Sequence, residues 1–281
     1  MSAPQPEPAA ELTFVKGHGT ENDFVLLPDP RGELELTAEL ARTLSDRRSG
    51  IGADGVIRVA PSPEHPDRFL MDYRNSDGSP AEMCGNGARV FARFLVDAGY
   101  QPAGTFTFDV RGGERVATVD GDGDVSVGLD VVTLGPDGPV AVVAGREHRG
   151  RAVNVGNPHL VTVLGPDDPE LADLDLAEPP SFSASDFPDG VNIEFVSVID
   201  DDRVRMRVYE RGAGETRSCG TGTAAVAAVQ LARTGRRVGT VTVDVPGGTV
   251  HVTIDDDGRA TLRGPAVLVY SGTLNPAVLA G

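Results

Sequence analysis

The sequence predicts an α+β protein of two pseudo-symmetric lobes that arose by internal duplication, each a mixed or antiparallel β-sheet rolled round a central helix. Two observations support this prediction. The chain of 281 residues repeats itself at an offset of 135 positions without a gap, so that TFTFDVRGG at 105–113 aligns with TVTVDVPGG at 240–248 with six identities in nine. Its only two cysteines, Cys84 and Cys219, are a pair at the same offset. A period of this length indicates duplication of a whole domain.

Each copy is predicted to begin with an extended stretch and to continue through a strand into a polar loop that ends at the cysteine. The opening stretches are predicted at 13–16 and 152–155, and the strands that precede the cysteine loops at 68–73 and 203–209. In the first copy, leucines at helical spacing also predict an α-helix over 35–44.

A helix is predicted shortly after each cysteine, over 88–98 and 223–233, and each is followed by a glycine, Gly99 or Gly235. The first helix is apolar on one face. The second is small and apolar on nearly every side, so other structure must surround it. Short alternating strands with glycine-rich turns follow in each copy, in the first at 105–110, 115–119 and 125–129.

We expect the N-terminal lobe to comprise residues 12–130, joined by the C-terminal segment 265–281, and the C-terminal lobe to comprise residues 131–264. A chain of this length is sufficient for two lobes with hydrophobic cores of their own. We expect the functional site in the cleft between them, because two copies of one site would face one another there.

The acidic composition excludes some classes of partner. The formal net charge is −17, which argues against nucleic acid or an anionic membrane surface. Acidic residues gather in turns at 120–124 and 255–258, which we interpret as solvated hairpin tips rather than calcium loops. Residues 1–10 lack the features of a signal peptide, and no segment has the length of a membrane span. We therefore expect a cytoplasmic protein with reduced cysteines.

Both cysteines are predicted at the first turn of a helix, where unpaired backbone N–H groups and the positive end of the helix dipole lie. We expect a thiol there to ionise more readily than a free cysteine, whose pKa is about 8.5. A carboxylate can bind the same N–H groups, which belong to Gly85, Asn86, Gly220 and Thr221. A carbon held between the two helix ends would have one sulfur on each face, which is the geometry for removing a proton from one face and adding one to the other.

Two other interpretations of these segments stay open. A cysteine in a cytoplasmic protein is often only a small buried hydrophobic residue, although two at equivalent helix starts favour a shared site. The segment GTGTAA at 220–225 also fits the Gly-x-Gly-x-x-Ala fingerprint of dinucleotide sites. That fingerprint follows an apolar strand, whereas the polar loop GETRS at 214–218 precedes it here.

The two copies differ at two informative positions. Phe24 and Asn75 in the first copy correspond to His159 and Glu210 in the second. We interpret His159 as a neutral histidine near one thiol, paired with the Glu210 carboxylate in the loop before Cys219, and setting which sulfur carries the proton. Taken alone, His159 would more often be a structural histidine.

Several long motifs occur in order along the chain. In the first copy they are NDF at 22–24, GIGADG at 50–55, RNSDG at 74–78 and EMCGNGAR at 82–89. In the second copy they are GNPH at 156–159, VNIEF at 191–195, YERGAGET at 209–216 and SCGTG at 218–222. From about Leu12 to about Tyr270, the sequence resembles the diaminopimelate epimerase family.

The resemblance implies interconversion of LL- and meso-diaminopimelate without a cofactor or a metal, in the synthesis of lysine and peptidoglycan precursors. It implies that Cys84 and Cys219 are the acid/base thiols and that His159 and Glu210 adjust their protonation. It implies that polar side chains and helix ends bind the substrate, namely Asn22, Asn75, Asn157, Asn192, Glu210 and Arg211 with Gly85, Asn86, Gly220 and Thr221. It also implies a homodimer with Tyr270 in the contact.

One departure and two alternatives accompany the resemblance. The chain has Gly55 where some members of the family have glutamine, so one side-chain contact to the substrate is absent or is made by water. A proline-type racemase would share the paired cysteines, but proline has no second amino-acid group to occupy Asn75, Asn157, Asn192 and Arg211. A non-catalytic amino-acid binding protein is the other alternative, and it would exchange no α-proton with solvent.

Overall fold

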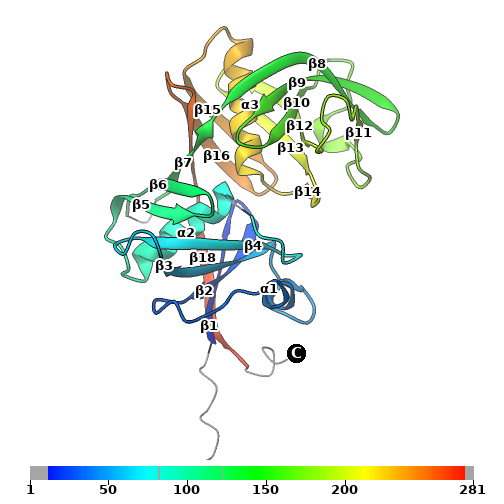
Figure 1. The fold of residues 1–281 in the computed structure, drawn as a ribbon. Coiled ribbons are helices and arrows are strands. Elements are labelled where there is room, and N and C mark those ends of the chain that lie inside the picture. The colour runs from blue at the N-terminus through cyan, green and yellow to red at the C-terminus, as the bar shows by residue number, and fades with distance from the viewer. Residues whose placement is uncertain (1–11, 82, 122, 276–281) are drawn as a thin grey trace, which may run out of the picture.

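The computed structural model describes residues 12–81, 83–121 and 123–275. Within these residues, the strands and three α-helices form two bodies of sheet and helix, one built mainly from each half of the chain (Figure 1). The two bodies are joined by an antiparallel pair of strands, β7 (Val125–Val131) and β17 (Arg259–Gly264). The two-lobed α+β architecture that the sequence predicts is confirmed.

The first lobe contains the helices α1 (Ala38–Ser45) and α2 (Gly85–Asp97). In hydrogen-bonded order its strands are β18 (Val267–Leu274), β1 (Leu12–Gly19), β2 (Asn22–Pro28), β3 (Gly55–Pro61), β4 (Phe69–Asn75), β5 (Gly104–Val110), β6 (Gly113–Val119) and β7. The pairs β2–β3 and β4–β5 are parallel, and the other neighbours are antiparallel. The last described strand of the chain therefore lies beside the first.

The second lobe surrounds α3 (Gly220–Arg233) and repeats this order of strands. Its strands are β8 (Thr133–Val143), β9 (Arg146–Asn154), β10 (Pro158–Val163), β12 (Asn192–Asp200), β13 (Arg203–Glu210), β15 (Gly239–Val245), β16 (Gly248–Ile254) and β17. The parallel pairs, β10–β12 and β13–β15, fall at the same two places as in the first lobe. Three small additions are β11 (Ser181–Phe182), β14 (Gly214–Thr216) and a 3-10 turn (Leu171–Asp173).

The duplication is visible in the element boundaries. The offset of 135 residues carries β5 onto β15 and β6 onto β16 at both ends, and the start of α2 onto the start of α3. β18 takes the place in the first lobe that β8 takes in the second, because each pairs with the strand that opens its copy, β1 or β9. The strand that completes the first lobe thus comes from the far end of the chain.

Each central helix packs in a core of its own. Val90, Phe91 and Leu95 of α2 are fully buried in one core, together with Phe24 and Phe108 from the surrounding strands. The small side chains of α3 are buried in a second core with residues of β12, β13 and β15–β17. The prediction that other structure surrounds this small apolar helix is confirmed.

Both central helices begin three residues earlier than the sequence predicts, at Gly85 and Gly220. Each cysteine is the N-cap, so Gly-x-Gly forms the first helical turn, and the prediction that both cysteines lie at a helix start is confirmed. Conversely, α1 begins three residues later than predicted, at Ala38. Thr37 caps it, and its hydroxyl accepts a hydrogen bond from the Leu40 amide at 3.1 Å.

Helix length also bears on membranes. α3 has 14 residues and so is about 21 Å long, shorter than the roughly 30 Å hydrocarbon layer of a bilayer. Among the described residues, no helix is both long and apolar enough to cross a membrane.

Candidate active site

The two cysteines occupy the same local structure in the two lobes. Cys84 is the N-cap of α2, and Cys219 is the N-cap of α3. Each sulfur accepts a hydrogen bond from the amide three residues on, Gly87 or Gly222, at 3.4 Å. The two amides directly after each cysteine lie outside the helical ladder, as the donors that a helix start offers to an anion.

The starts of α2 and α3 touch one another. A Cβ atom on Gly220 would lie 3.1 Å from the Gly85 Cα and 3.5 Å from the Asn86 nitrogen, and one on Gly85 would lie 3.5 Å from the Gly220 Cα. The missing side chains permit this close approach of two backbones. The positive ends of two helix dipoles therefore meet at one place, with a thiol at the start of each helix.

On the side of the first lobe, Asn22 lies between Cys84 and Asn86. The Asn22 Oδ1 is 3.6 Å from the Cys84 sulfur and accepts from the Asn86 Nδ2 at 3.2 Å. The Asn22 Nδ2 donates to Asp54 at 2.7 Å, which fixes the orientation of the amide. The Asn86 Oδ1 is buried and has no hydrogen-bond partner among the described residues.

Hydrogen bonds cross between the lobes directly beside Cys219. The Asn86 Nδ2 donates to the Ser218 carbonyl at 3.0 Å, and the Thr20 hydroxyl donates to the Ser218 hydroxyl at 2.7 Å. Arg89, which is fully buried, donates to the Thr20 oxygen at 3.2 Å. Burial lowers the pKa of Arg89 to about 10, so the guanidinium remains a cation at neutral pH. No described carboxylate forms an ion pair with it.

On the side of the second lobe, Glu210 and Thr221 contact Cys219. The Cys219 thiol hydrogen-bonds to the Glu210 carboxylate, and the Thr221 Oγ1 is 3.6 Å from the sulfur. Burial raises the pKa of Glu210, against the hydrogen bonds from Thr216 and Cys219, which lower it. A carboxyl with a raised pKa that faces a thiol is suited to exchanging a proton with it.

His159 lies on the same side of the site and contacts a carboxylate to which the sequence interpretation assigned no role. Its Nδ1 is 2.6 Å from the Glu194 Oε1, and its Nε2 is 3.0 Å from the Asn157 Oδ1. His159 and Glu194 are both 0% exposed. The direct partner of His159 is therefore Glu194, whereas Glu210 contacts the thiol.

The ionisation of the thiols differs from the expectation for a helix start. Burial raises the pKa of Cys84 to about 11 and raises that of Cys219 well above its ordinary value. The amide bonds to the sulfurs lower both pKa values, but the charge of Glu210 raises them. The prediction of easily ionised thiols is wrong for this structure, because the loss of water outweighs the helix-end amides.

Gly55 provides the space that Tyr73 occupies. A Cβ on Gly55 would lie 2.5 Å from the Tyr73 Cε2 and 3.0 Å from its hydroxyl oxygen. That hydroxyl donates to the Asn75 Oδ1 at 2.8 Å. Burial, and then the charges of Cys84 and Glu210, raise the pKa of Tyr73 well above its ordinary value. A phenol hydroxyl therefore lies where a longer side chain at position 55 would project.

Asn192 supports the loop that carries Arg211. The Asn192 Oδ1 accepts from the Arg211 backbone amide at 3.0 Å, and its Nδ2 donates to the Pro158 carbonyl at 3.1 Å. The exposed Arg211 guanidinium donates to the Asp189 carbonyl at 2.8 Å. No carboxylate of the described residues pairs with it, so the cation is open to an anionic group.

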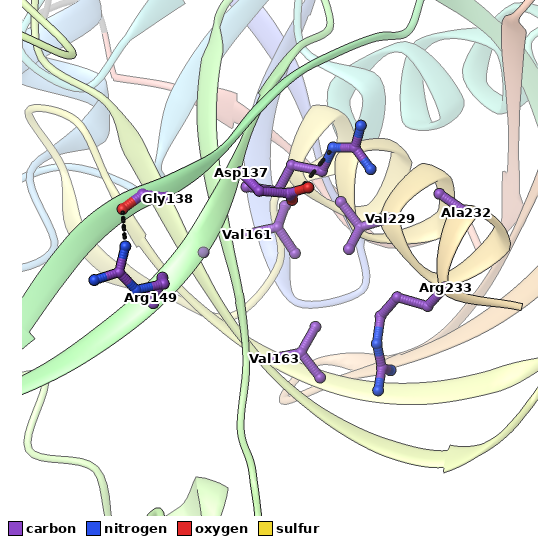
Figure 2. A pocket seen from close by; sticks show the side chains of 10 residues that line it. Asp137, Gly138, Arg149, Val161, Val163, Val229, Ala232 and Arg233 are labelled. Atoms are coloured by element: carbon purple, nitrogen blue, oxygen red, sulfur yellow. Dashed lines mark hydrogen bonds and ion pairs between the residues drawn. The ribbon is translucent and has the colours of Figure 1, made fainter.

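A surface hollow of about 400 Å³ lies away from the cysteines. Its lining includes residues of the strands and of the last turn of α3, among them Asp137, Arg149, Arg151, Val161, Ala232 and Arg233 (Figure 2). Cys219 caps the other end of this 14-residue helix, about 20 Å distant. Arg151 is held by Asp137 at 3.6 Å. We therefore assign the hollow no part in the reaction.

Three residues at the site were given no role by the sequence. Glu194 lies in the apolar run VNIEFV, and Arg89 lies on a helix face that packs inward. Charged residues are almost never fully buried unless they are paired. A charged residue at a predicted core position was therefore the signal that could have identified Glu194 and Arg89. Tyr73 carried no such signal, because its position in an apolar strand is ordinary for an aromatic residue.

Solved structures with low sequence identity share this fold. One is a phenazine biosynthesis protein of the PhzF family from Bacillus anthracis (TM-score 0.70, 14% identity, 95% of this chain and 100% of that chain covered). Another is a probable proline racemase from Agrobacterium radiobacter (TM-score 0.69, 17% identity, coverage 94% and 93%). A hydroxyproline epimerase from Agrobacterium vitis has a TM-score of 0.68, 15% identity and coverage of 94% and 92%. These likenesses show the fold alone.

Sequence comparison is more specific. The family model described as diaminopimelate epimerase matches residues 14–135 and 151–269. The chain is 46% identical over 293 residues to a diaminopimelate epimerase of Streptomyces coelicolor, covering 97% of this chain and 99% of the relative. It is 49% identical over 290 residues to one of Mycolicibacterium paratuberculosis, with coverage of 94% and 97%. Matches of this extent to the family model and to named relatives show that the chain belongs to the diaminopimelate epimerase family.

Proposed function

We propose that this chain is a cofactor-independent epimerase that interconverts LL- and meso-diaminopimelate by two-cysteine acid/base catalysis, in lysine and peptidoglycan-precursor synthesis. The observation that supports it most is the meeting of the two helix starts at Gly85 and Gly220, each with a cysteine as N-cap. We propose that the reacting carbon lies between the two sulfurs.

In this mechanism one cysteine, as thiolate, removes the α-proton from one face, and the other, as thiol, donates a proton to the opposite face. The first sulfur then carries the proton and the second is the thiolate, so the reverse reaction begins from the product state. Because burial disfavours both thiolates, a proton must leave one thiol before reaction. Glu210, whose own pKa is raised by burial and whose charge acts on both thiols, is the group placed to accept it.

Stabilising the carbanion is the main difficulty, since an amino-acid α-proton is weakly acidic. We propose that the substrate's α-carboxylate binds the backbone amides of Gly85, Asn86, Gly220 and Thr221 at the two helix starts. Charge spreads onto this carboxylate as the proton leaves, and donors already in place stabilise it without reorganising. Between the two lobes, water is excluded and these contacts become stronger.

Recognition of the rest of the substrate is assigned to polar groups around the two sulfurs. Asn22, between Cys84 and Asn86, and the buried unpartnered Asn86 Oδ1 are placed to accept from the α-ammonium group. The exposed Arg211 suits the distal carboxylate through its planar fork. Asn75, Asn157 and Asn192 complete this proposed set, and Tyr73 occupies the place of a side chain at position 55.

We further propose the lobe boundaries 12–130 with 265–281 and 131–264, a cytoplasmic location and a homodimer. The pairing of β18 with β1 supports the assignment of the C-terminal segment to the first lobe; residues 276–281 of that segment lie outside the described residues. Tyr270 on β18 is 49% exposed and its ring lies edge-on to Phe14, with centroids 5.9 Å apart. With the exposed Val267 and Val269, it offers an apolar strand surface to a second copy.

The proposed activity is tested by proton exchange. Incubated in D₂O with LL-diaminopimelate, the protein should introduce deuterium at the α-carbon, and the product should contain the meso isomer, as measured by NMR and chiral chromatography. With proline it should do neither. Exchange with proline alone would make the chain a proline-type racemase, and exchange with neither substrate would make it a binding protein.

The dimer is tested at the exposed strand. Tyr270→Ala removes a large aromatic side chain from the centre of the proposed contact, and such residues often cost more than about 1 kcal/mol when truncated. We expect the variant to dissociate at protein concentrations where the wild type is a dimer, as measured by analytical ultracentrifugation. Val116→Ala, at a 47% exposed residue of β6, is the control and should leave the mass unchanged. A monomeric wild type would contradict the proposal.

A further inference from the structure

The pair His159 and Glu194 has an apolar counterpart in the other lobe. The two residues lie on the neighbouring parallel strands β10 and β12, and the offset of 135 residues assigns them to Phe24 and Val59. Phe24 and Val59 are both fully buried and belong to the same hydrophobic core. The fold therefore accepts hydrophobic residues at these two positions and does not require a charged pair.

The pair is also costly to bury. Both residues are 0% exposed, and although one Glu194 oxygen is bonded to His159, the Oε2 has no partner among the described residues. Removing two charges from water offsets much or all of their attraction, and hydrophobic replacements are often neutral or stabilising. A half-satisfied buried carboxylate therefore needs an explanation other than stability.

The Glu194 carboxylate lies against the first turn of α3. A Cβ on Gly222 would lie 2.6 Å from the Glu194 Oε1, and the Gly222 amide donates to the Cys219 sulfur at 3.4 Å. The carboxylate and the thiol thus have Gly222 as a common neighbour. After burial and the charge of Glu210, the charge of Glu194 raises the pKa of Cys219.

The imidazole of His159 lies between two polar partners. Its Nδ1 faces the Glu194 carboxylate and its Nε2 faces the Asn157 Oδ1. These two contacts fix the orientation of the ring. The sequence interpretation paired His159 with Glu210, whereas the carboxylate that His159 contacts directly is Glu194.

In the first lobe the group that distinguishes the thiol is a cation rather than a carboxylate. Its buried cation Arg89 lowers the pKa of Cys84, and the residue at the equivalent position of the second lobe is Ala224. The ionisable groups that face the pair of thiols from the elements around them are His159 on β10, Glu194 on β12, Glu210 on β13, Arg89 on α2 and Tyr73 on β4. Only the charge of Glu210 raises the pKa of both thiols. The difference between the two thiols therefore arises from the other groups.

We propose that Glu194 is a positioning residue, which holds His159 between itself and Asn157 and whose charge keeps Cys219 in the thiol form, so that Cys84 is the first sulfur to act as a base. This rests on the proposed two-cysteine function and adds to it the origin of the asymmetry between the two thiols. Glu194 touches neither the reacting carbon nor, in hydrogen bonds, the sulfur, and it acts through His159 and through its charge.

The test is Glu194→Gln, which keeps the size of the side chain and an oxygen for His159 but removes the charge. Each cysteine is alkylated with iodoacetamide across a pH series in the absence of substrate, and the two peptides are quantified by mass spectrometry. We expect the Cys219 profile to move down by about one pH unit while the Cys84 profile stays in place. The ¹⁵N NMR signal of the His159 Nδ1 should shift, because its partner loses its charge, and kcat should fall by about tenfold.

Two further variants separate a positioning role of Glu194 from a merely structural one. Asp109→Asn is the matched control, because Asp109 is another buried carboxylate bonded to a histidine, His65 at 2.7 Å, and it should affect neither the Cys219 profile nor kcat. The double variant His159→Phe/Glu194→Val installs the pair of the first lobe. It should fold with an undiminished melting temperature and lose activity.

Two outcomes would overturn the proposal. One is an unchanged Cys219 profile in Glu194→Gln, and the other is wild-type kcat in the double variant, which would make the pair structural. Glu194→Asp, which keeps the charge, should restore the Cys219 profile in part. If the wild type itself does not epimerise diaminopimelate, the proposed function fails, whereas the alkylation and NMR results still decide the role of Glu194 in the free protein.

Discussion

Replacing either Cys84 or Cys219 with alanine is expected to lower kcat by about 10²- to 10⁴-fold or more in both directions, since each stereoisomer needs one sulfur as base and the other as acid. The measurement is chiral chromatography of the reaction from LL- and from meso-diaminopimelate. Near-normal turnover by either alanine variant would refute the two-thiol mechanism.

The same variants should still exchange protons. The remaining cysteine, as thiolate, can remove the α-proton of the one stereoisomer whose proton points toward it. It can then return a deuteron to the same face of the carbon. Each variant should therefore incorporate deuterium into one stereoisomer without inverting it, and the two variants should differ in which stereoisomer they label. Serine variants are the control for folding, because a hydroxyl keeps the N-cap role of the sulfur but is a far weaker acid.

Gly220→Ala is expected to reduce both stability and turnover. The added Cβ would lie 3.1 Å from the Gly85 Cα and 3.1 Å from the Leu262 Cδ2, so the starts of α2 and α3 must separate by a few tenths of an ångström. Overpacking of this kind costs about 1–3 kcal/mol. A misplacement of about 1 Å can cost 10²-fold in rate, so we expect a loss of about tenfold in kcat.

The control for this prediction is Gly165→Ala. A Cβ there would meet nothing nearer than the Asp168 Oδ2 at 3.7 Å, which is an ordinary contact. Thermal unfolding and steady-state kinetics of both variants decide the prediction. If Gly220→Ala behaves like the control, the contact between the helix starts does not position the catalytic groups.

Much of the fold was predictable because it is encoded in local patterns. The alternating strands and their glycine turns, the helix after each cysteine, and the duplication itself are all properties of short segments or of their spacing. The errors at helix starts have a local cause as well. The apolar pattern of each central helix begins only after Gly-x-Gly, but a cysteine N-cap whose sulfur accepts from Gly87 or Gly222 starts the helix earlier.

The chemistry of the site was less predictable than its location. Helix-end amides favour a thiolate, and this is the effect that a sequence can show. Burial acts in the opposite direction and is larger here, raising the pKa of Cys84 to about 11. The extent of burial depends on how completely two lobes cover the sulfurs, which no local pattern contains. The same holds for Glu194, whose partner His159 lies 35 residues away in the chain.

By itself the sequence determined the duplication, the equivalence of Cys84 and Cys219, and the motifs that relate the chain to its family, since each is a matter of residue identity and spacing. Only the tertiary structure decided that Gly85 meets Gly220, that Glu194 pairs with His159, and that burial raises the pKa of both thiols. These features arise from contacts between segments that are distant in the chain. Their energies depend on the distance between charges and on exclusion of solvent, and both are set only when the lobes pack together.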